Sequence, residues 1–293
     1  MPRAIDHVVH ASRDLAAQAE FYKRLGFTVG ARNHHPWGTE NHIVQFPDHF
    51  LELIGRGPGF RAPVDLDPHV FSFAGFVTQE LERGEGISML ALQSKDAAAT
   101  RAEFKAAGVG DFEPFHFERK GRKADGSESH VAFTLAFAHS KLMPHCGLFA
   151  CQHHHPEDFF APEWQIHANG AVGVAGVVMV AENPAAHAEF LSAVTGQREM
   201  LATSMGIDLE VADERSIEVL TQAAFVHRFG QAALGGPDAE TRVAACRIAV
   251  RDLAVVEEIF QDNQISAARV GRRLVIPPVT AFGAALAFEA VTD

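Results

Sequence analysis

Histidine and acidic side chains are the groups in this sequence that can bind a metal ion or move protons. The chain has 17 histidines. Two candidate ligands stand inside apolar segments, His7 in residues 5–12 and Glu52 in residues 50–54, and Gln152 opens the run Gln152-His153-His154-His155. An imidazole nitrogen with a carboxylate oxygen suits Zn²⁺, Fe²⁺, Mn²⁺, Ni²⁺ or Co²⁺. A histidine in a strand is equally compatible with a core residue that donates to a backbone carbonyl, so both interpretations stay open.

Other chemistry has little support in the sequence. It contains no glycine-rich phosphate loop, nucleophile elbow or kinase motif. The three cysteines, Cys146, Cys151 and Cys246, are too few for a disulfide framework, and the first two lack zinc-ribbon spacing. We predict that all three are small buried core residues in a reducing, cytoplasmic protein.

Composition excludes several classes of partner. The formal charge is −12, from 25 basic and 37 acidic residues, which argues against binding to nucleic acid or to an anionic membrane surface. No apolar run reaches the roughly 18 residues of a membrane span, and the first residues lack the apolar core of a signal peptide. The expected partner is a small-molecule substrate, and a homodimer is compatible with the sequence.

One pattern of strand, helix cap, amphipathic helix and helix stop occurs four times. The predicted strands are residues 5–12, 87–94, 174–181 and 243–250. The caps are Asp14, Asp96, Asn183 and Asp252, and the stops are Gly26, Gly108, Gly196 and Asn263. Short β-type segments follow each stop, for example residues 27–32, 42–46 and 50–54 in the first copy. The repeat therefore predicts four βαβββ units.

Two segments fall outside the units. Phe73, Phe76, Val77 and Leu81 have helical spacing, so residues 70–83 are predicted to form an extra helix between the first and second copies. Residues 155–173 are rich in proline and aromatics and connect the two halves. We expect an N-terminal domain of residues 1–160 with the candidate metal site. A C-terminal domain of residues 161–293 would be structural or dimer-forming.

The motifs of the first half resemble those of the vicinal oxygen chelate superfamily, which includes glyoxalase I, extradiol dioxygenases and bleomycin-resistance proteins. The resemblance lies in Asp6-His7-Val8-Val9, in the helix of residues 14–27 and in Leu51-Glu52-Leu53-Ile54. Segments 71–73, 84–86, 151–157 and 167–171 are similar to those of its glyoxalase-like domain subgroup. The resemblance implies an α+β fold in which four tandem βαβββ units pair into two curved mixed sheets. One such sheet would cup a divalent metal.

The same resemblance implies that His7 and Glu52 lie side by side as metal ligands. Counting back from the helix caps aligns His7 with Met89, Gly176 and Ala245, so no copy supplies a second first-strand ligand. The four-ligand set of glyoxalase I is therefore incomplete, which puts that activity in doubt. His153 is the favoured third ligand, with Gln152 or His154 as substitutes.

Further residues are candidates for the substrate pocket. His42 is the predicted proton-moving residue, and His42 and His130 are expected on the floor of the cup. His167 and Asn169 match the connecting-loop motif of the subgroup. His34-His35 is interpreted as a solvated turn, with a loop that overhangs the cup as the alternative. Glu218 is interpreted as an ordinary paired carboxylate with no imidazole opposite it.

The predicted function is that of a divalent-metal-dependent enzyme that acts on a small oxygen-chelating substrate, as an isomerase, lyase or dioxygenase. The alternative is a metal-free protein that sequesters a small ligand, as bleomycin-resistance proteins do.

Overall fold

The computed structural model describes residues 2–60, 67, 69–122, 128–234 and 240–291. Within these ranges the chain forms the four predicted βαβββ units. The first half contains β1 (Ile5–Ala11), α1 (Leu15–Arg24), β2 (Asn33–His34), β3 (Thr39–Gln45) and β4 (Phe50–Arg56), then α2 (Phe73–Arg83), β5 (Gly86–Gln93), α3 (Ala97–Ala106), β6 (Phe115–Arg122), β7 (Glu128–Ala138) and β8 (Gly147–His153). The second half contains β9 (Ala171–Val180), α5 (Ala188–Thr195), β10 (Leu201–Thr203), β11 (Gly206–Glu210) and β12 (Ser216–Leu220), then α6 (Gln222–Phe229), β13 (Arg242–Val250), α7 (Leu253–Asp262), β14 (Ala268–Val270), β15 (Arg273–Ile276) and β16 (Ala285–Ala290).

Helix capping largely follows the sequence pattern. The side chains of Asp14, Asp96 and Asp252 each accept a hydrogen bond from the first helical turn. Asn183 makes no such bond, because a 3₁₀ turn of Pro184–His187 precedes α5. The predicted strand at residues 27–32 is wrong, since only Asn33–His34 pairs with β3.

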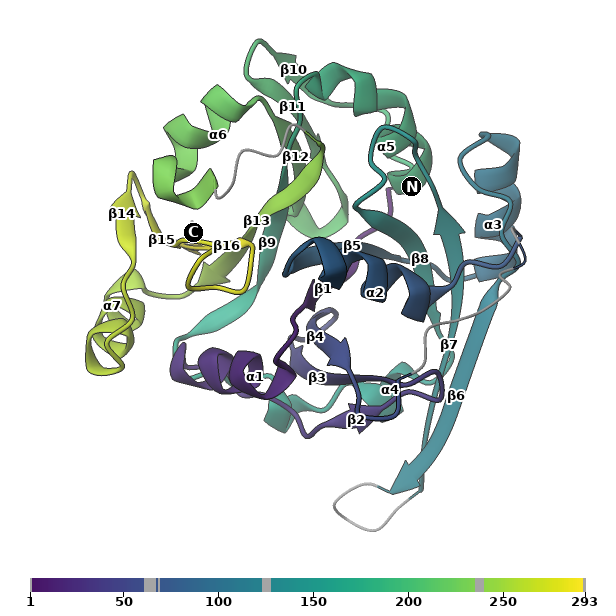
Figure 1. Cartoon of the computed structure of the whole chain (residues 1–293), viewed down its shortest axis with the longest axis horizontal. Coiled ribbons are helices and arrows are strands. Elements are labelled where there is room, and N and C mark those ends of the chain that lie inside the picture. The colour runs from purple at the N-terminus through teal and green to yellow at the C-terminus, as the bar shows by residue number, and fades with distance from the viewer. Residues whose placement is uncertain (1, 61–66, 68, 123–127, 235–239, 292–293) are drawn as a thin grey trace.

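Each half forms a curved eight-stranded sheet (Figure 1). The orders are β2-β3-β4-β1-β5-β8-β7-β6 and β10-β11-β12-β9-β13-β16-β15-β14. Strands β1 and β5 pair antiparallel, as do β9 and β13. The expectation of two separate sheets needs one correction. The pairing of Val243 in β13 with Ile87 in β5 joins them at a single residue pair. The predicted domain boundary at residue 160 lies just after the short helix α4 (Pro156–Phe159) and stays a prediction.

Helices cover both faces of the sheets. Tyr22, Phe104, Leu191 and Phe260, one from each unit helix, belong to a single core on the outer face. On the inner face, α2 covers part of the first sheet through Phe73, Val77 and Leu81. The predicted extra helix is therefore confirmed, with Ser72 as its cap.

Helix α6 was not predicted, and it is the counterpart of α2. Each follows the fourth strand of its half, and α6 packs Phe225 and Phe229 on the inner face of the second sheet. We call the inner faces of the first and second sheets the first and second cups. No helix among the described residues is long and apolar enough to cross a membrane.

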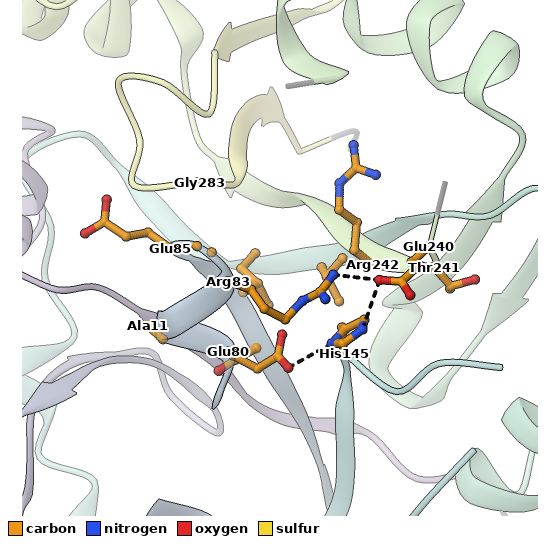
Figure 2. A pocket seen from close by; sticks show the side chains of 14 residues that line it. Ala11, Glu80, Arg83, Glu85, His145, Glu240, Thr241, Arg242 and Gly283 are labelled. Carbon is orange, nitrogen blue, oxygen red and sulfur yellow. Dashed lines mark hydrogen bonds and ion pairs between the residues drawn. The ribbon is translucent and has the colours of Figure 1, made fainter. Parts of the chain in front are cut away.

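Ion pairs line a cavity of about 110 Å³ between the two halves (Figure 2). Arg83 of α2 pairs with Glu240 at 2.6 Å, and His145 lies 2.9 Å from Glu80 and 3.0 Å from Glu240. Glu240 precedes β13, so these contacts tie the first cup's helix to the second half.

A buried imidazole makes a further connection. The hydroxyl of Tyr22 donates to Nδ1 of His10 at 2.9 Å, and Nε2–H of His10 donates to the carbonyl of Phe282 at 2.8 Å. Both bonds suit the neutral ring. Burial lowers the pKa of His10 from 6.5 to about 4, although the bond to Phe282 acts in the opposite direction.

This pKa predicts how stability depends on pH. The unfolded chain binds the His10 proton near pH 6.5 and the folded protein only near pH 4, so the stabilisation present above pH 6.5 is lost as the pH falls. The wild type should lose about 2 kcal/mol between pH 7 and pH 5 through this group. Urea unfolding of His10→Gln, which keeps a donor and an acceptor, should show a pH dependence weaker by that amount. Equal slopes for the two proteins would contradict the assignment.

Candidate functional site

The first cup contains a cavity of about 80 Å³ beside helix α2. Its walls are mainly aromatic, and its polar side chains are few. The polar lining residues are His7, His35, Asn41, Glu52 and Cys151. The aromatic lining residues are Trp37, Phe50, Phe73, Phe115, Phe117, Phe133, Phe149 and Phe159. A small cavity of this kind, with polar groups gathered among apolar walls, is typical of a ligand site.

A β-bulge in β1 brings two ionisable side chains together. Ile5 and His7 pair with Leu92 and Ala91 of β5, so Asp6 is an extra residue without a partner there. A bulge breaks the alternation of faces that would otherwise send Asp6 and His7 to opposite sides. Asp6 Oδ1 therefore lies 2.5 Å from His7 Nδ1, although the two residues are adjacent in sequence.

Asp6 is a buried carboxylate surrounded by donors. It is 2% exposed, and His153 Nε2 lies 3.1 Å from its Oδ2. The Cys151 thiol lies close to Asp6, and burial raises the pKa of this thiol well above its usual range. Burial alone would raise the pKa of Asp6, but the charges and hydrogen bonds of His153 and His7 hold it well below its usual range. Asp6 is thus an anion that accepts hydrogen bonds from two imidazoles.

This arrangement sets the tautomer and the orientation of His7. Because an ionised carboxylate only accepts, His7 donates its Nδ1–H to Asp6, and in the neutral ring Nε2 keeps a free lone pair. The ring is stacked on Phe50 with centroids 4.3 Å apart. His7 Nε2 then lies 3.8 Å from Glu52 Oε2.

A hydrogen bond to the other carboxylate oxygen, Oε1, holds Glu52 in place. Asn41 Nδ2 donates to Glu52 Oε1 at 2.5 Å and lies 3.2 Å from His35 Nε2. Since an amide nitrogen can only donate, His35 Nε2 is the acceptor and the ring is neutral. Burial is also the main cause that lowers the pKa of His35. Glu52 Oε2 and His7 Nε2 are left as the two acceptors that face each other.

These two atoms fit the requirements of a shared divalent ion. Ligand bonds of about 2.0–2.2 Å allow two donors to stand up to about 4.4 Å apart, and the observed separation is 3.8 Å. In many metal sites an acidic residue accepts a hydrogen bond from the second ring nitrogen of a ligating histidine. Asp6, His7 and Cys151 also form a donor group with ligand atoms within 4.8 Å of one another. Asp6 already accepts hydrogen bonds from His7 and His153, so we assign it to orientation, and Cys151 is the remaining donor of this group.

The second unit offers no equivalents of His7 and Glu52. The caps Asp14 and Asp96 are 82 positions apart, which aligns His7 with Met89. Val9 pairs with Glu52 and Ala91 with Phe149, so Phe149 takes the place of Glu52. The part of the first cup built by the first unit is thus polar, and the equivalent part built by the second unit is apolar.

The structure brings some predicted residues to this site and leaves others out. His42 faces away, because its neighbours Asn41 and Ile43 line the cavity, and its Nδ1 donates to the Gly30 carbonyl at 2.8 Å. The expectation that His42 lies on the cup floor is corrected by this alternation. His153 is near the site, but its Nε2 contacts Asp6 at 3.1 Å while its Nδ1 has no partner among the described residues.

The remaining pocket candidates lie elsewhere. Gln152 Oε1 accepts from the backbone of Ala97, and His154 Nε2 contacts Thr134 at 2.7 Å. His130 lies 3.0 Å from Glu118.

The connecting-loop residues have structural roles. His167 accepts from Thr28 N and donates to the Gln45 carbonyl, and Asn169 Nδ2 donates to the Leu25 carbonyl at the end of α1. Both residues are buried and fully bonded, so they hold the connecting segment in place and do not line the cavity.

The sequence does not single out three residues of the site: Asp6 appears only as part of a motif, His35 is interpreted as a solvated turn residue, and Asn41 is not a candidate. The prediction that all three cysteines are buried is confirmed, and Cys151 belongs to the core beside the cavity. An aspartate inside an otherwise apolar strand was an available signal for Asp6. The alternation of Asn41 with Ile43 along β3 was another. The side chain of His35 is only 10% exposed, because it stacks on Trp37 at 4.6 Å.

The second cup has an ion-paired carboxylate at the place where the first cup has the free ligand atoms of His7 and Glu52. Val178 pairs with Glu218 as Val9 does with Glu52, and Gly176 stands in the position of His7. Glu218 binds Arg228 of α6 and also Arg247, the latter at 2.7 Å. Glu218 is therefore a paired carboxylate, as expected from the sequence.

Comparison with known proteins supports the fold and the family. Residues 5–195 match the family model described as a glyoxalase-like domain. The match covers well over half of the chain, so the chain belongs to this family, as the motifs of the first half predicted. No curated protein sequence matches significantly.

Similar solved structures extend over nearly the whole chain. A hypothetical protein from Staphylococcus aureus has a TM-score of 0.66 at 13% identity, covering 98% of this chain and 99% of that one. A mutant 4-hydroxymandelate synthase from Streptomyces coelicolor has a TM-score of 0.56 at 12% identity and 100% and 94% coverage. The Mn(II)-bound glyoxalase from Novosphingobium aromaticivorans has a TM-score of 0.53 at 11% identity and 99% and 83% coverage. At these identities the likeness shows the glyoxalase-like fold.

The role of Asp6 predicts a large effect on stability. Asp6→Ala leaves the donors of His7 and His153 without an acceptor, and should lower the free energy of unfolding by about 3 kcal/mol. Urea denaturation measures this loss. Asp111→Ala removes an exposed carboxylate and should leave the unfolding midpoint unchanged. An Asp6→Ala protein as stable as the Asp111→Ala control would contradict the role of Asp6.

Proposed function

We propose that this glyoxalase-like domain protein is a divalent-metal-dependent enzyme that acts on a small substrate with neighbouring oxygen atoms. The observation that carries the proposal is the pair His7 Nε2 and Glu52 Oε2, which face each other at 3.8 Å in the first cup. With the His7 ring neutral, both atoms are acceptors without hydrogens, and two such acceptors at this distance attract either a cation or a ligand that donates to both. The Mn(II)-bound glyoxalase neighbour favours the cation.

Each residue has a defined task in this proposal. His7 and Glu52 would hold the metal, which when bound would polarise the chelating oxygens of the substrate. Asp6 keeps His7 in the required tautomer through the bond to Nδ1, and Asn41 keeps Glu52 Oε1 occupied so that Oε2 points to the ion. Cys151 is the nearest further protein donor. Positions left free by the protein would be filled by the substrate or by water.

In this proposal His35, in place of His42, is the residue that moves protons. His35 lines the cavity, and its Nε2 lies 4.0 Å from Glu52 Oε1. Its neutral ring, favoured by burial, would accept a proton from a substrate at Nε2 when the hydrogen bond from Asn41 to that atom is given up. Chelation of neighbouring oxygens is common to isomerase, lyase and dioxygenase chemistry, and the proposal covers these three reaction classes.

A second candidate function has one observation in its favour. Met89 and Phe149 occupy the places in the second unit that correspond to His7 and Glu52, so the protein supplies half of a symmetrical donor set. A metal-free protein that sequesters a small ligand needs the cavity but no complete donor set. Metal content distinguishes the two functions.

The metal proposal predicts the behaviour of two ligand variants. Untagged protein dialysed against Mn²⁺, Zn²⁺ or anaerobic Fe²⁺ should retain one of these ions at close to one equivalent. His7→Ala and Glu52→Gln should weaken its binding by at least about 100-fold, because each removes a ligand from a small set. Elemental analysis after gel filtration measures the retained metal.

His34→Ala serves as the matched control, since His34 is an exposed histidine that lies outside the cavity. It should bind metal as the wild type does. Circular dichroism should show that His7→Ala is still folded. Wild-type protein that retains none of the three ions would contradict the enzyme and support the ligand-sequestering function.

A further inference from the structure

We propose that the substrate of the first cup carries an aromatic ring, which lies among the phenylalanines while its oxygens face His7 and Glu52. This inference rests on the proposed function for the position of the oxygens. For the rest of the substrate, the inference rests on the aromatic walls of the cavity.

The polar groups of the cavity are largely occupied by one another. Asn41 bonds to Glu52 Oε1 and His35, and His7 Nδ1 bonds to Asp6. A ligand therefore meets two free acceptors, His7 Nε2 and Glu52 Oε2, at one end of the cavity. The rest of the lining is aromatic or aliphatic, apart from the Cys151 thiol and the side chains of His35 and Asn41, whose polar atoms bond within the protein. Such a site recognises a molecule with a polar end and an apolar remainder.

The apolar wall is built from aromatic rings that meet edge to face. Phe115 and Phe117 stand at 5.0 and 5.2 Å from Trp37, with interplanar angles of 79° and 78°. Phe133 and Phe159 meet in the same way at 5.5 Å and 85°. Rings of this orientation present both faces and edges to the enclosed space, and a flat ring gains from both kinds of contact. A flexible alkyl chain gains from neither and loses rotational freedom on binding.

The enclosed space is smaller than a ring-bearing substrate. The cavity volume of about 80 Å³ compares with roughly 150 Å³ for an apolar cavity that holds one benzene ring. Part of a ring-bearing ligand therefore lies in the open part of the pocket.

The experiment uses three 2-hydroxy acids and one fluorescent reporter. Mandelate and lactate share neighbouring oxygens and differ in a phenyl against a methyl group, and 2-hydroxyoctanoate has as many carbon atoms as mandelate but no ring. The protein has two tryptophans, and Trp164 is exposed and lies outside the cavity. In Trp164→Phe the emission comes from Trp37 alone, so titration with each acid reports binding in the first cup.

Mandelate should bind at least about tenfold more tightly than lactate, since burial of a phenyl group is worth at least that factor. It should also bind at least about threefold more tightly than 2-hydroxyoctanoate. Equal binding of mandelate and lactate, equal binding of mandelate and 2-hydroxyoctanoate, or no response to mandelate would each overturn the inference.

A variant of the wall gives an independent check. Phe117→Leu removes a half-buried ring and should weaken mandelate binding about three- to tenfold while leaving lactate binding unchanged. The control Phe190→Leu lies in α5, outside the cavity, and should change neither. Equal losses for both acids in Phe117→Leu would contradict contact between the two rings.

The titrations are made on EDTA-treated protein and again with added Mn²⁺. A preference for the ring in both states supports an aromatic substrate. If Mn²⁺ fails to tighten mandelate binding while the ring preference persists, the metal proposal fails and the aromatic substrate class stands.

Discussion

The site depends on one buried carboxylate placed by one extra residue. The β-bulge at Asp6 turns a side chain that would face the helices into the cup. There Asp6 meets His7, His153 and Cys151, which lie on two strands from different units. A buried charge of this kind is stable only while all its partners are present. The lone pair that His7 offers to the cavity is therefore a consequence of the way β1 departs from regular pairing.

The repeated architecture explains why only the first cup keeps a carboxylate that no arginine among the described residues contacts. Both halves place a helix on the inner face, α2 in the first and α6 in the second. In the second cup, Arg247 and Arg228 supply positive charge to Glu218, at the place that corresponds to Glu52. In the first cup no arginine contacts Glu52 among the residues described, and Asn41 provides a neutral donor instead. The carboxylate of the first cup thus keeps the capacity to bind a cation, and that of the second has been neutralised by the protein itself.

The sequence was sufficient for the architecture because the repeat is local and periodic. Caps such as Asp14 and Asp252, apolar strands and glycine stops are short-range signals, and they recur four times. Helix α6 is not predicted, because its two phenylalanines, Phe225 and Phe229, follow closely on a strand with no glycine or proline between them.

The site was predicted less completely than the fold. His7 and Glu52 came from motif resemblance, and their proximity is present in the structure. The bulge at Asp6 could not be predicted, since the register between β1 and β5 is a long-range property. For the same reason, the sequence predicts the wrong face of β3 for His42. His35 is not recognised either, because the turn that carries it is ordered by the stacking of its ring on Trp37. Tertiary packing thus decided the orientation of each residue that the local pattern misjudged.

The central claim is that His7 offers Nε2 to a metal while Asp6 holds Nδ1, and nitrogen NMR of the histidine rings tests it most directly. In protein labelled with ¹⁵N at histidine, with resonances assigned by single substitutions, metal-free His7 should carry its proton on Nδ1. Addition of one equivalent of Zn²⁺ should then shift the Nε2 resonance of His7 strongly, with the bonded ring of His167 unaffected. A Zn²⁺ titration that leaves His7 unchanged, or a metal-free His7 protonated on Nε2, would contradict the account.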